Sequence, residues 1–149
     1  MSRNAVFPGS FDPFTIGHLA LLKRAVLLFD KVTVAIGVNT QKKCFMSAEQ
    51  RLATIMAATR GMATVDVLTY SGLTTDLCHE LGANYIVRGV RNTTDFDYER
   101  TVADNNRLIA PDIETVLLIA EPQYAVISST LVRELAAFGK DYSRYVVDV

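Results

Sequence analysis

The sequence predicts an α/β fold in which one parallel sheet is joined by crossover helices. Short apolar, strand-like runs alternate with longer helix-like runs along the chain, and this alternation is typical of parallel sheets. The run at residues 32–37 is apolar at nearly every position, as expected for a central strand buried on both faces. A length of 149 residues, of which 50% are hydrophobic, favours a single domain over residues 1–149.

The first half of the chain supplies three of the five expected strands. They cover residues 5–7, 32–37 and 65–68. The helix predicted at residues 17–29 has so few polar positions that we expect burial on more than one side, in the core or at a subunit contact. The next helix opens at Ser47, which has capping-box spacing with Gln50.

The second half continues the alternation. Strands are expected at residues 85–87 and 116–119, and a helix with a weak apolar stripe at residues 94–109. Before them, a helix carries leucines at fourfold spacing and ends at Gly82. The last predicted helix starts near Ser128 and ends before Gly139, with three residues expected to face inward: Leu131, Leu135 and Phe138.

Composition excludes several classes of protein. The formal charge of −1, from 15 basic and 16 acidic residues, gives no support for a general nucleic-acid surface. Cys44 and Cys78 lie far apart, which excludes a zinc-ribbon or disulfide framework. No apolar stretch approaches the roughly 20 residues that cross a bilayer, and the first residues do not resemble a signal peptide. We therefore expect a cytoplasmic protein with no nucleic-acid or membrane partner.

The most informative segment is the loop at residues 9–18, GSFDPFTIGH, between the first strand and the first helix. Helix N-termini present unpaired N–H groups and the positive end of a dipole, so phosphate binds well there. Gly17 allows close approach of the backbone to phosphate, and His18 adds a side-chain donor. Asp12 and Pro13 are interpreted as structural, with Asp12 binding backbone N–H groups. The loop predicts a nucleotide-phosphate site.

Three further polar segments follow strands and are expected at the same edge of the sheet, where ligands bind in α/β folds. They are Lys42–Lys43, residues 88–91 and residues 124–130. Arg88 and Arg91 flank a glycine and suit phosphate binding. Hydroxyls and N–H groups around residue 128 would form a second anion site at a helix N-terminus. We expect residues 9–18 and 88–91 to lie side by side.

Missing motifs narrow the chemistry. The sequence contains neither G-x-x-x-x-G-K-[ST] nor a G-x-G-x-x-G after the first strand, and it has no G-x-S-x-G elbow. There is no convincing carboxylate pair or Cys–His dyad. A reaction that needs no protein nucleophile fits best.

The motif T-I-G-H at residues 15–18 resembles the T/H-x-G-H motif of nucleotidyltransferases, and I-S-S-T-L-V-R at residues 127–133 resembles their second signature. Within that superfamily the chain is similar to bacterial phosphopantetheine adenylyltransferases. Segments 7–13, 42–43, 87–91, 95–99 and 127–129 follow that family's order and spacing. The resemblance covers nearly the whole chain.

The resemblance implies a single Rossmann-like, doubly wound domain with a five-stranded parallel sheet. It also implies adenylyl transfer from ATP to 4′-phosphopantetheine, giving dephospho-coenzyme A and pyrophosphate, by direct in-line attack without a covalent enzyme intermediate. Mg²⁺ would bridge the nucleotide phosphates, with no metal ligand from the protein. The family is usually hexameric, and coenzyme A is a candidate inhibitor.

Residue roles are carried over position by position. His18 would be catalytic, stabilising charge on the α-phosphate. The acceptor 4′-phosphopantetheine would be bound by Ser10, Lys42, Thr74 and Arg88. ATP would be held by Ser10, Phe11, His18, Gly89, Val90, Arg91, Glu99, Tyr124, Ala125, Val126, Ile127, Ser128, Ser129 and Thr130.

Some positions depart from the family pattern. Ser10 stands where Thr is common, and Cys44 replaces a frequent proline after the lysines. Ile16, Ala20 and Tyr124 are also unusual, and the chain ends early compared with most relatives. Two alternatives stay open: a transferase acting on nicotinamide or nicotinate mononucleotide or using CTP, and a nucleotide-binding regulatory or assembly protein that has lost catalysis.

Overall fold

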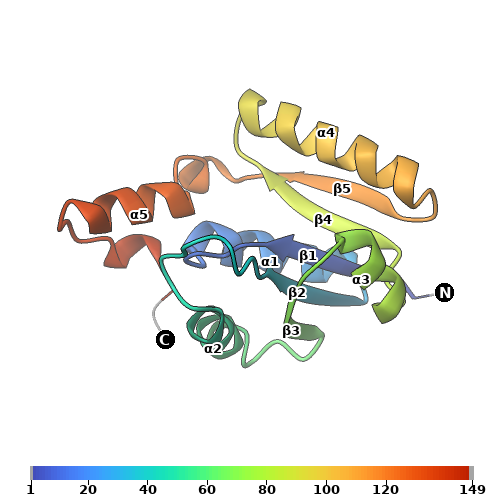
Figure 1. Ribbon diagram of the computed structural model, residues 1–149, viewed down its shortest axis with the longest axis horizontal. Coiled ribbons are helices and arrows are strands. Elements are labelled where there is room, and N and C mark those ends of the chain that lie inside the picture. Colours follow the sequence, from blue (N-terminus) through green and yellow to red (C-terminus); the bar gives the residue numbers. More distant parts are fainter. Residues whose placement is uncertain (1, 148–149) are drawn as a thin grey trace.

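The computed structural model describes residues 2–147 and contains a five-stranded, all-parallel sheet (Figure 1). The strand order is β3-β2-β1-β4-β5. The strands are β1 (Asn4–Gly9), β2 (Lys31–Gly37), β3 (Val65–Tyr70), β4 (Tyr85–Val90) and β5 (Glu114–Ile119). Each expected strand is present and extends by one to three residues at one or both ends. The predicted doubly wound α/β architecture is confirmed.

Helices cover both faces of the sheet. They are α1 (Ile16–Leu28), α2 (Ala48–Ala58), α3 (Thr74–Leu81), α4 (Thr93–Ile109) and α5 (Ser129–Ala137), with short 3-10 turns η1 (Pro122–Tyr124) and η2 (Ser143–Tyr145). The predicted capping box of Ser47 and Gln50 opens α2. Gly82 ends α3 in the left-handed conformation at φ 68°, where glycine avoids a side-chain clash. None of these helices has the length and apolarity needed to cross a membrane.

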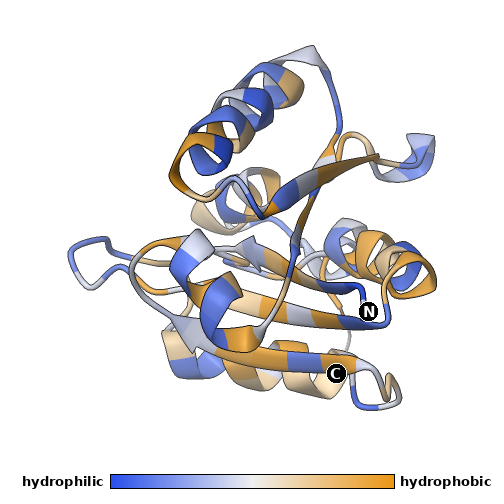
Figure 2. Cartoon of the chain, turned by 90° about the vertical axis from the view of Figure 1, so that its right-hand side faces the viewer, coloured by the Kyte–Doolittle hydropathy of each residue, from blue (hydrophilic) through white to orange (hydrophobic). Residues whose placement is uncertain are grey.

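Alternate residues of β1 supply two separate cores. Ala5 and Phe7 pack with buried residues of α1 and α2, such as Leu22 and Ile55. Val6 points the other way, into a cluster that contains residues of α3 and the end of α4. Figure 2 shows apolar colouring along the strands in the middle of the molecule. This two-sided burial explains why the β2 sequence reads as continuously apolar.

The order of the strands reverses next to β1. Along its length β1 pairs with β2, but it pairs with β4 only at Ala5↔Tyr85 and Val6↔Ile86. From Phe7 onward the carboxyl ends of β1 and β4 therefore separate. A crevice at such a switch point is the usual ligand site of an open α/β sheet.

One packing prediction was wrong, and one is left to a subunit contact. Phe138 was expected to face inward from the last helix, but α5 ends at Ala137 and Phe138 is 80% exposed. Val132 is the buried residue of that helix. In α1, Leu27 is 82% exposed, so the apolar composition of this helix is not explained by burial within the chain.

Candidate active site

The crevice between β1 and β4 holds two adjoining cavities. The first, of about 350 Å³, lies among the loop after β1, the start of α1, the end of β4, and the starts of α4 and α5. The second, of about 280 Å³, is lined by the ends of β1, β2 and β3 and by α4. They share five lining residues: Gly9, Ser10, Arg88, Tyr98 and Glu99. The predicted meeting of residues 9–18 with residues 88–91 is confirmed.

His18 lies at the N-terminus of α1 with its ring fixed on several sides. The Thr15 backbone N–H donates to His18 Nδ1 over 2.9 Å, and the Thr15 side chain accepts from the His18 N–H. Phe14 stacks on the imidazole at 5.5 Å between ring centroids, and Phe11 meets it edge-on at 5.1 Å. Because Nδ1 accepts a hydrogen bond, the ring proton of the neutral imidazole resides on Nε2.

Phe11 adopts a positive φ of 49°, which is uncommon for a non-glycine residue and marks a constrained turn. The residue is only 4% exposed, and its ring lies against the rings of Phe7, Phe14 and His18. Although Phe11 lines the first cavity, its observed contacts orient the His18 ring.

The electrostatic surroundings keep His18 neutral. Burial, followed by the positive charges of Arg88 and Arg91, lowers the pKa of His18 from 6.5 to about 3. The unfolded chain therefore binds this proton first as the pH falls. His18 therefore lowers the free energy of unfolding as the pH falls from about 6.5 toward 3. Above about pH 6.5 it has no such effect.

A pH titration by NMR tests this assignment. The sequence contains two histidines, so a His79→Gln variant leaves His18 as the sole imidazole. We expect its ring signals to stay in the neutral form, with the proton on Nε2, between about pH 8 and pH 5. A titration midpoint near the ordinary histidine value would contradict the assigned state.

Arg88 extends from β4 into the gap where the two strands part. Its Nε and Nη2 donate to both carboxylate oxygens of Glu99 over 2.9 and 2.6 Å, and its Nη1 donates to the Pro8 carbonyl. The carboxylate of Glu99 is nearly buried, with 7% of its side chain exposed. Glu99, predicted as an ATP contact, thus holds Arg88 in place. The pKa of Arg88 is raised by Glu99 although burial opposes it, so Arg88 keeps its charge.

The start of α5 closes the first cavity opposite α1. The hydroxyls predicted to bind anions are engaged within the protein: Ser128 Oγ accepts from the Leu131 N–H, and Ser129 Oγ donates to the Pro13 carbonyl. The backbone N–H groups of Ser129 and Thr130, the first two residues of α5, have no intrahelical partner, so they suit an anion better than the hydroxyls do.

Arg133 was missed as a site residue, although it ends the quoted motif at residues 127–133. It lines the first cavity and donates to the Asp12 carbonyl over 2.8 Å and to Thr130 Oγ1 over 3.1 Å. Among residues 2–147 it takes part in no ion pair, so its charge is not neutralised there. Asp95 and Tyr98, also missed, line the same cavity, and Asp95 pairs with Arg91.

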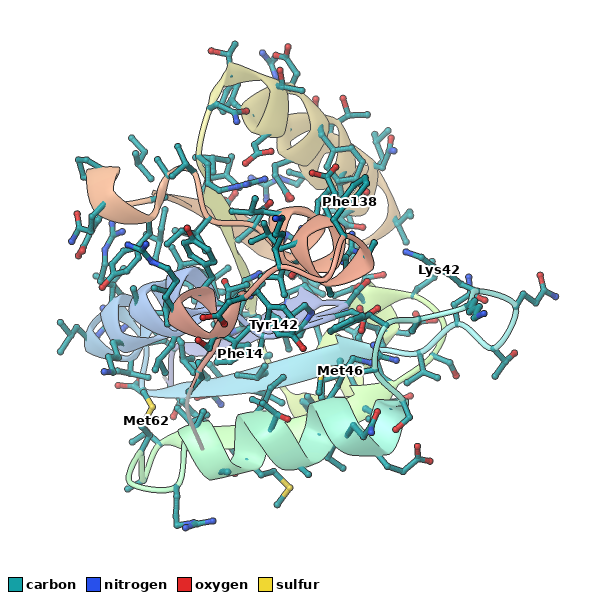
Figure 3. All side chains as sticks on the ribbon, turned by 90° about the vertical axis from the view of Figure 1, so that its left-hand side faces the viewer. Phe14, Lys42, Met46, Met62, Phe138 and Tyr142 are labelled. Atoms are coloured by element: carbon teal, nitrogen blue, oxygen red, sulfur yellow. The ribbon has the colours of Figure 1, made fainter. Side chains whose placement is uncertain are left out.

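The Asp12 carboxylate binds the loop between β2 and α2, which carries Lys42 and Lys43, as predicted for a structural residue. It accepts hydrogen bonds from the backbone N–H groups of Phe45 and Met46 over 2.8 and 2.7 Å. Figure 3 shows Lys42 on the loop that leads from β2 to α2. Lys42 is exposed and lines neither cavity.

The remaining predicted residues divide into two groups. Those that line a cavity are Ser10, Phe11, Thr74, Gly89, Arg91, Tyr124, Ile127, Ser128 and Ser129. Those that line neither are Val90, Ala125, Val126 and Thr130. Val90 is buried in the sheet, and Val126 is 78% exposed. Thr74 lies in the second cavity and hydrogen bonds to the Tyr70 hydroxyl over 2.8 Å.

Comparisons with known proteins identify the family of this chain. Residues 6–135 match the Cytidylyltransferase-like family, so the chain is a nucleotidyltransferase by fold and sequence. Solved structures support the fold: a putative nicotinate-nucleotide adenylyltransferase from Vibrio parahaemolyticus superposes with a TM-score of 0.74 over 99% of this chain and 95% of that chain, at 20% identity.

Curated relatives are closer in sequence. The phosphopantetheine adenylyltransferase of Limosilactobacillus reuteri is 47% identical over 95% of this chain and 82% of its own length. The enzyme of the same name from Porphyromonas gingivalis is 46% identical over 98% of this chain and 95% of its own. This chain belongs to the phosphopantetheine adenylyltransferase family.

Proposed function

We propose that this protein transfers the adenylyl group of ATP to 4′-phosphopantetheine, forming dephospho-coenzyme A and releasing pyrophosphate. Family membership makes the chain an enzyme of this type. The observation that carries the residue-level proposal is the pair of adjoining cavities that share Ser10 and Arg88. Two phosphate-bearing substrates can occupy them with their phosphates meeting at the shared wall.

The first cavity suits ATP. Gly89 and Arg91 line one side, and the N-terminus of α5 with Arg133 lines another. Helix dipole, unpaired N–H groups and guanidinium groups together favour a triphosphate. The second cavity suits phosphopantetheine, because Arg88 and Ser10 lie at one end. Other residues that line it are both polar and apolar, which fits a pantetheine arm. They include Tyr70, Thr74, Val102, Ala103 and Asn106.

The reaction then needs no protein nucleophile. An oxygen of the acceptor phosphate forms a bond to the α-phosphorus of ATP while the bond to the bridging oxygen of the β-phosphate breaks. The second pKa of a phosphate monoester is about 6, so near pH 7 the acceptor is largely dianionic and needs no general base. The protein aligns the two anions and neutralises their charge, which is the usual source of catalysis in such transfers.

His18 contributes as a neutral hydrogen-bond donor. Its Nε2–H would donate to a non-bridging oxygen of the α-phosphate, on which charge accumulates as the acceptor attacks. The fixed ring and depressed pKa of His18 support this role, because the donor is pre-oriented and requires no change of protonation.

Mg²⁺ would bind through the nucleotide phosphates rather than in a protein cage. The carboxylates that line the first cavity are already engaged: Asp12 by backbone N–H groups, Asp95 by Arg91 and Glu99 by Arg88. No cluster of three or more metal-ligating side chains occurs within residues 2–147. This donor set fits an ion that is held by phosphate oxygens and water, and that screens charge on the nucleotide when bound.

We also propose that the protein is a cytoplasmic homo-oligomer, a hexamer as in its family, with coenzyme A as a candidate inhibitor. Three exposed apolar residues support an assembly surface: Leu27 is 82% exposed, Ile119 75% and Val126 78%. Arg24 joins α1 to the end of β5 by donating to the Ile119 carbonyl over 2.6 Å.

Sedimentation equilibrium should give a hexamer for the wild type and smaller species for Leu27→Glu, because the charge would lie on the proposed assembly surface. A monomeric wild type would refute the proposed assembly.

The assay that tests the function is pyrophosphate release from ATP and Mg²⁺ with a panel of acceptors. We expect release that depends on 4′-phosphopantetheine, with dephospho-coenzyme A as the second product. Release with nicotinamide or nicotinate mononucleotide instead, or with CTP in place of ATP, would assign a different transferase. Binding of ATP without turnover for any acceptor would assign a protein that has lost catalysis.

A further inference from the structure

Arg51, in the first turn of α2, has an arrangement that the proposed chemistry does not use. Only 3% of the residue is exposed. Its Nη1 donates to the Ser10 carbonyl over 2.8 Å and to the Gly37 carbonyl over 3.2 Å, and its Nη2 lies 3.9 Å from Cys44 Sγ. The guanidinium therefore joins the loop after β1 to the end of β2.

This arrangement is costly for the folded protein. Among residues 2–147 no carboxylate lies within 4.0 Å of the guanidinium, and Arg51 Nε has no hydrogen-bond partner. Buried charges are usually paired. The residue also places a positive charge near the N-terminus of α2, where the helix dipole is itself positive. Packing alone would be served better by an apolar side chain.

The two carbonyls that Arg51 binds belong to the wall of the second cavity. Ser10 and Gly37 both line it, while Gly37 does not line the first. Arg51 lines neither cavity, so it cannot touch a substrate in this arrangement. With its carbonyl held by Arg51, Ser10 keeps its side chain exposed at the wall that the two cavities share.

We infer that Arg51 is a positioning residue for the acceptor phosphate. It holds the Ser10 turn against the end of β2, and its unneutralised charge lies behind the wall where the phosphate of the acceptor would bind. The inference rests on the proposed function, since it assigns Arg51 to the acceptor side of that reaction. A buried guanidinium without a carboxylate partner is then compensated when the anionic acceptor binds.

The test compares Arg51→Met and Arg51→Lys with the wild type. Arg51→Met removes the hydrogen bonds to the Ser10 and Gly37 carbonyls together with the positive charge behind the acceptor wall. We expect Arg51→Met to raise KM for 4′-phosphopantetheine about tenfold or more, with KM for ATP within about twofold. Arg51→Lys keeps the positive charge but carries its donors on a single nitrogen. Its KM for the acceptor should therefore lie between the values for the wild type and for Arg51→Met.

Thr59→Val is the matched control. Thr59 lies at the end of the same helix with 6% of its surface exposed, and its hydroxyl donates to the Ile55 carbonyl within that helix. Its substitution should lower Tm and leave both KM values unchanged. Circular dichroism establishes that each variant is folded.

Folded Arg51 variants with an unchanged KM for the acceptor would overturn the inference, as would equal increases in both KM values. If Arg51→Met does not fold, the KM ratio of Arg51→Lys decides in the same way. A wild type that does not use 4′-phosphopantetheine counts against the proposed function, whereas an active wild type with kinetically normal variants counts against Arg51 alone.

Discussion

Replacing His18 with alanine should lower kcat about 100- to 1,000-fold, because removing one donor to a developing oxyanion typically has this effect. Binding of ATP should weaken by less than about threefold, since the donor acts mainly in the transition state. Single-turnover kinetics gives the rate of transfer, and equilibrium titration with ATP gives the affinity. An equal loss of ATP affinity with kcat unchanged would remove His18 from the transition state.

A second variant separates catalysis from folding. His18 is also the third residue of α1, where its Nδ1 completes a capping box with Thr15. His18→Ala should therefore also cost about 1 kcal/mol of unfolding free energy. Glutamine is a usual residue at this capping position, so His18→Gln should restore stability without restoring the rigid Nε2–H donor. Wild-type kcat in His18→Gln would contradict the need for the imidazole.

Replacing Arg88 with methionine should destabilise the protein by about 3–5 kcal/mol, because it leaves the nearly buried carboxylate of Glu99 without its partner. Adding Glu99→Gln removes the unpaired charge and should restore most of this stability. The double variant should nevertheless stay inactive, since the acceptor phosphate would still lack the guanidinium. Urea unfolding and pyrophosphate release measure the two effects separately.

The exposed pair Arg100–Asp104 is the control for this experiment, with side chains 70% and 69% exposed. Arg100→Met should change the unfolding free energy by less than about 0.5 kcal/mol and leave turnover intact. A double Arg88/Glu99 variant as unstable as Arg88→Met would show that the loss comes from packing. Wild-type turnover in the double variant would show that Arg88 does not act on substrate.

The sheet could be predicted from the sequence because each strand has a local signature. The apolar run of β2, the leucines before Gly82 and the Ser47 capping box each follow from neighbouring residues, and each is present. The shared edge of the site followed from topology, since carboxyl ends of parallel strands meet there. Phe138 was misplaced because the helical spacing of Leu131 and Leu135 was extended to the C-cap residue, which lies beyond Ala137, the last residue of α5.

Side-chain contacts between different helices, strands and loops could not be predicted in this way. Glu99 has the spacing of a surface residue on α4, and only the packing of α4 on β4 reveals that it holds Arg88. Arg51 likewise follows a polar capping box, a position typical of a solvated side chain. Only the packing of α2 against the Ser10 turn shows that it is buried there. His18 was identified as a donor, but the Thr15 N–H that fixes its tautomer required the loop conformation.

The stereochemical course at the α-phosphorus tests the central claim most directly. The claim is that two anions are aligned in adjoining cavities and react without passing the adenylyl group to the protein. ATP carrying a chiral α-thiophosphate should give dephospho-coenzyme A with inverted configuration, as a single in-line displacement requires. Retention would require two displacements through a covalent enzyme intermediate, and would contradict the account.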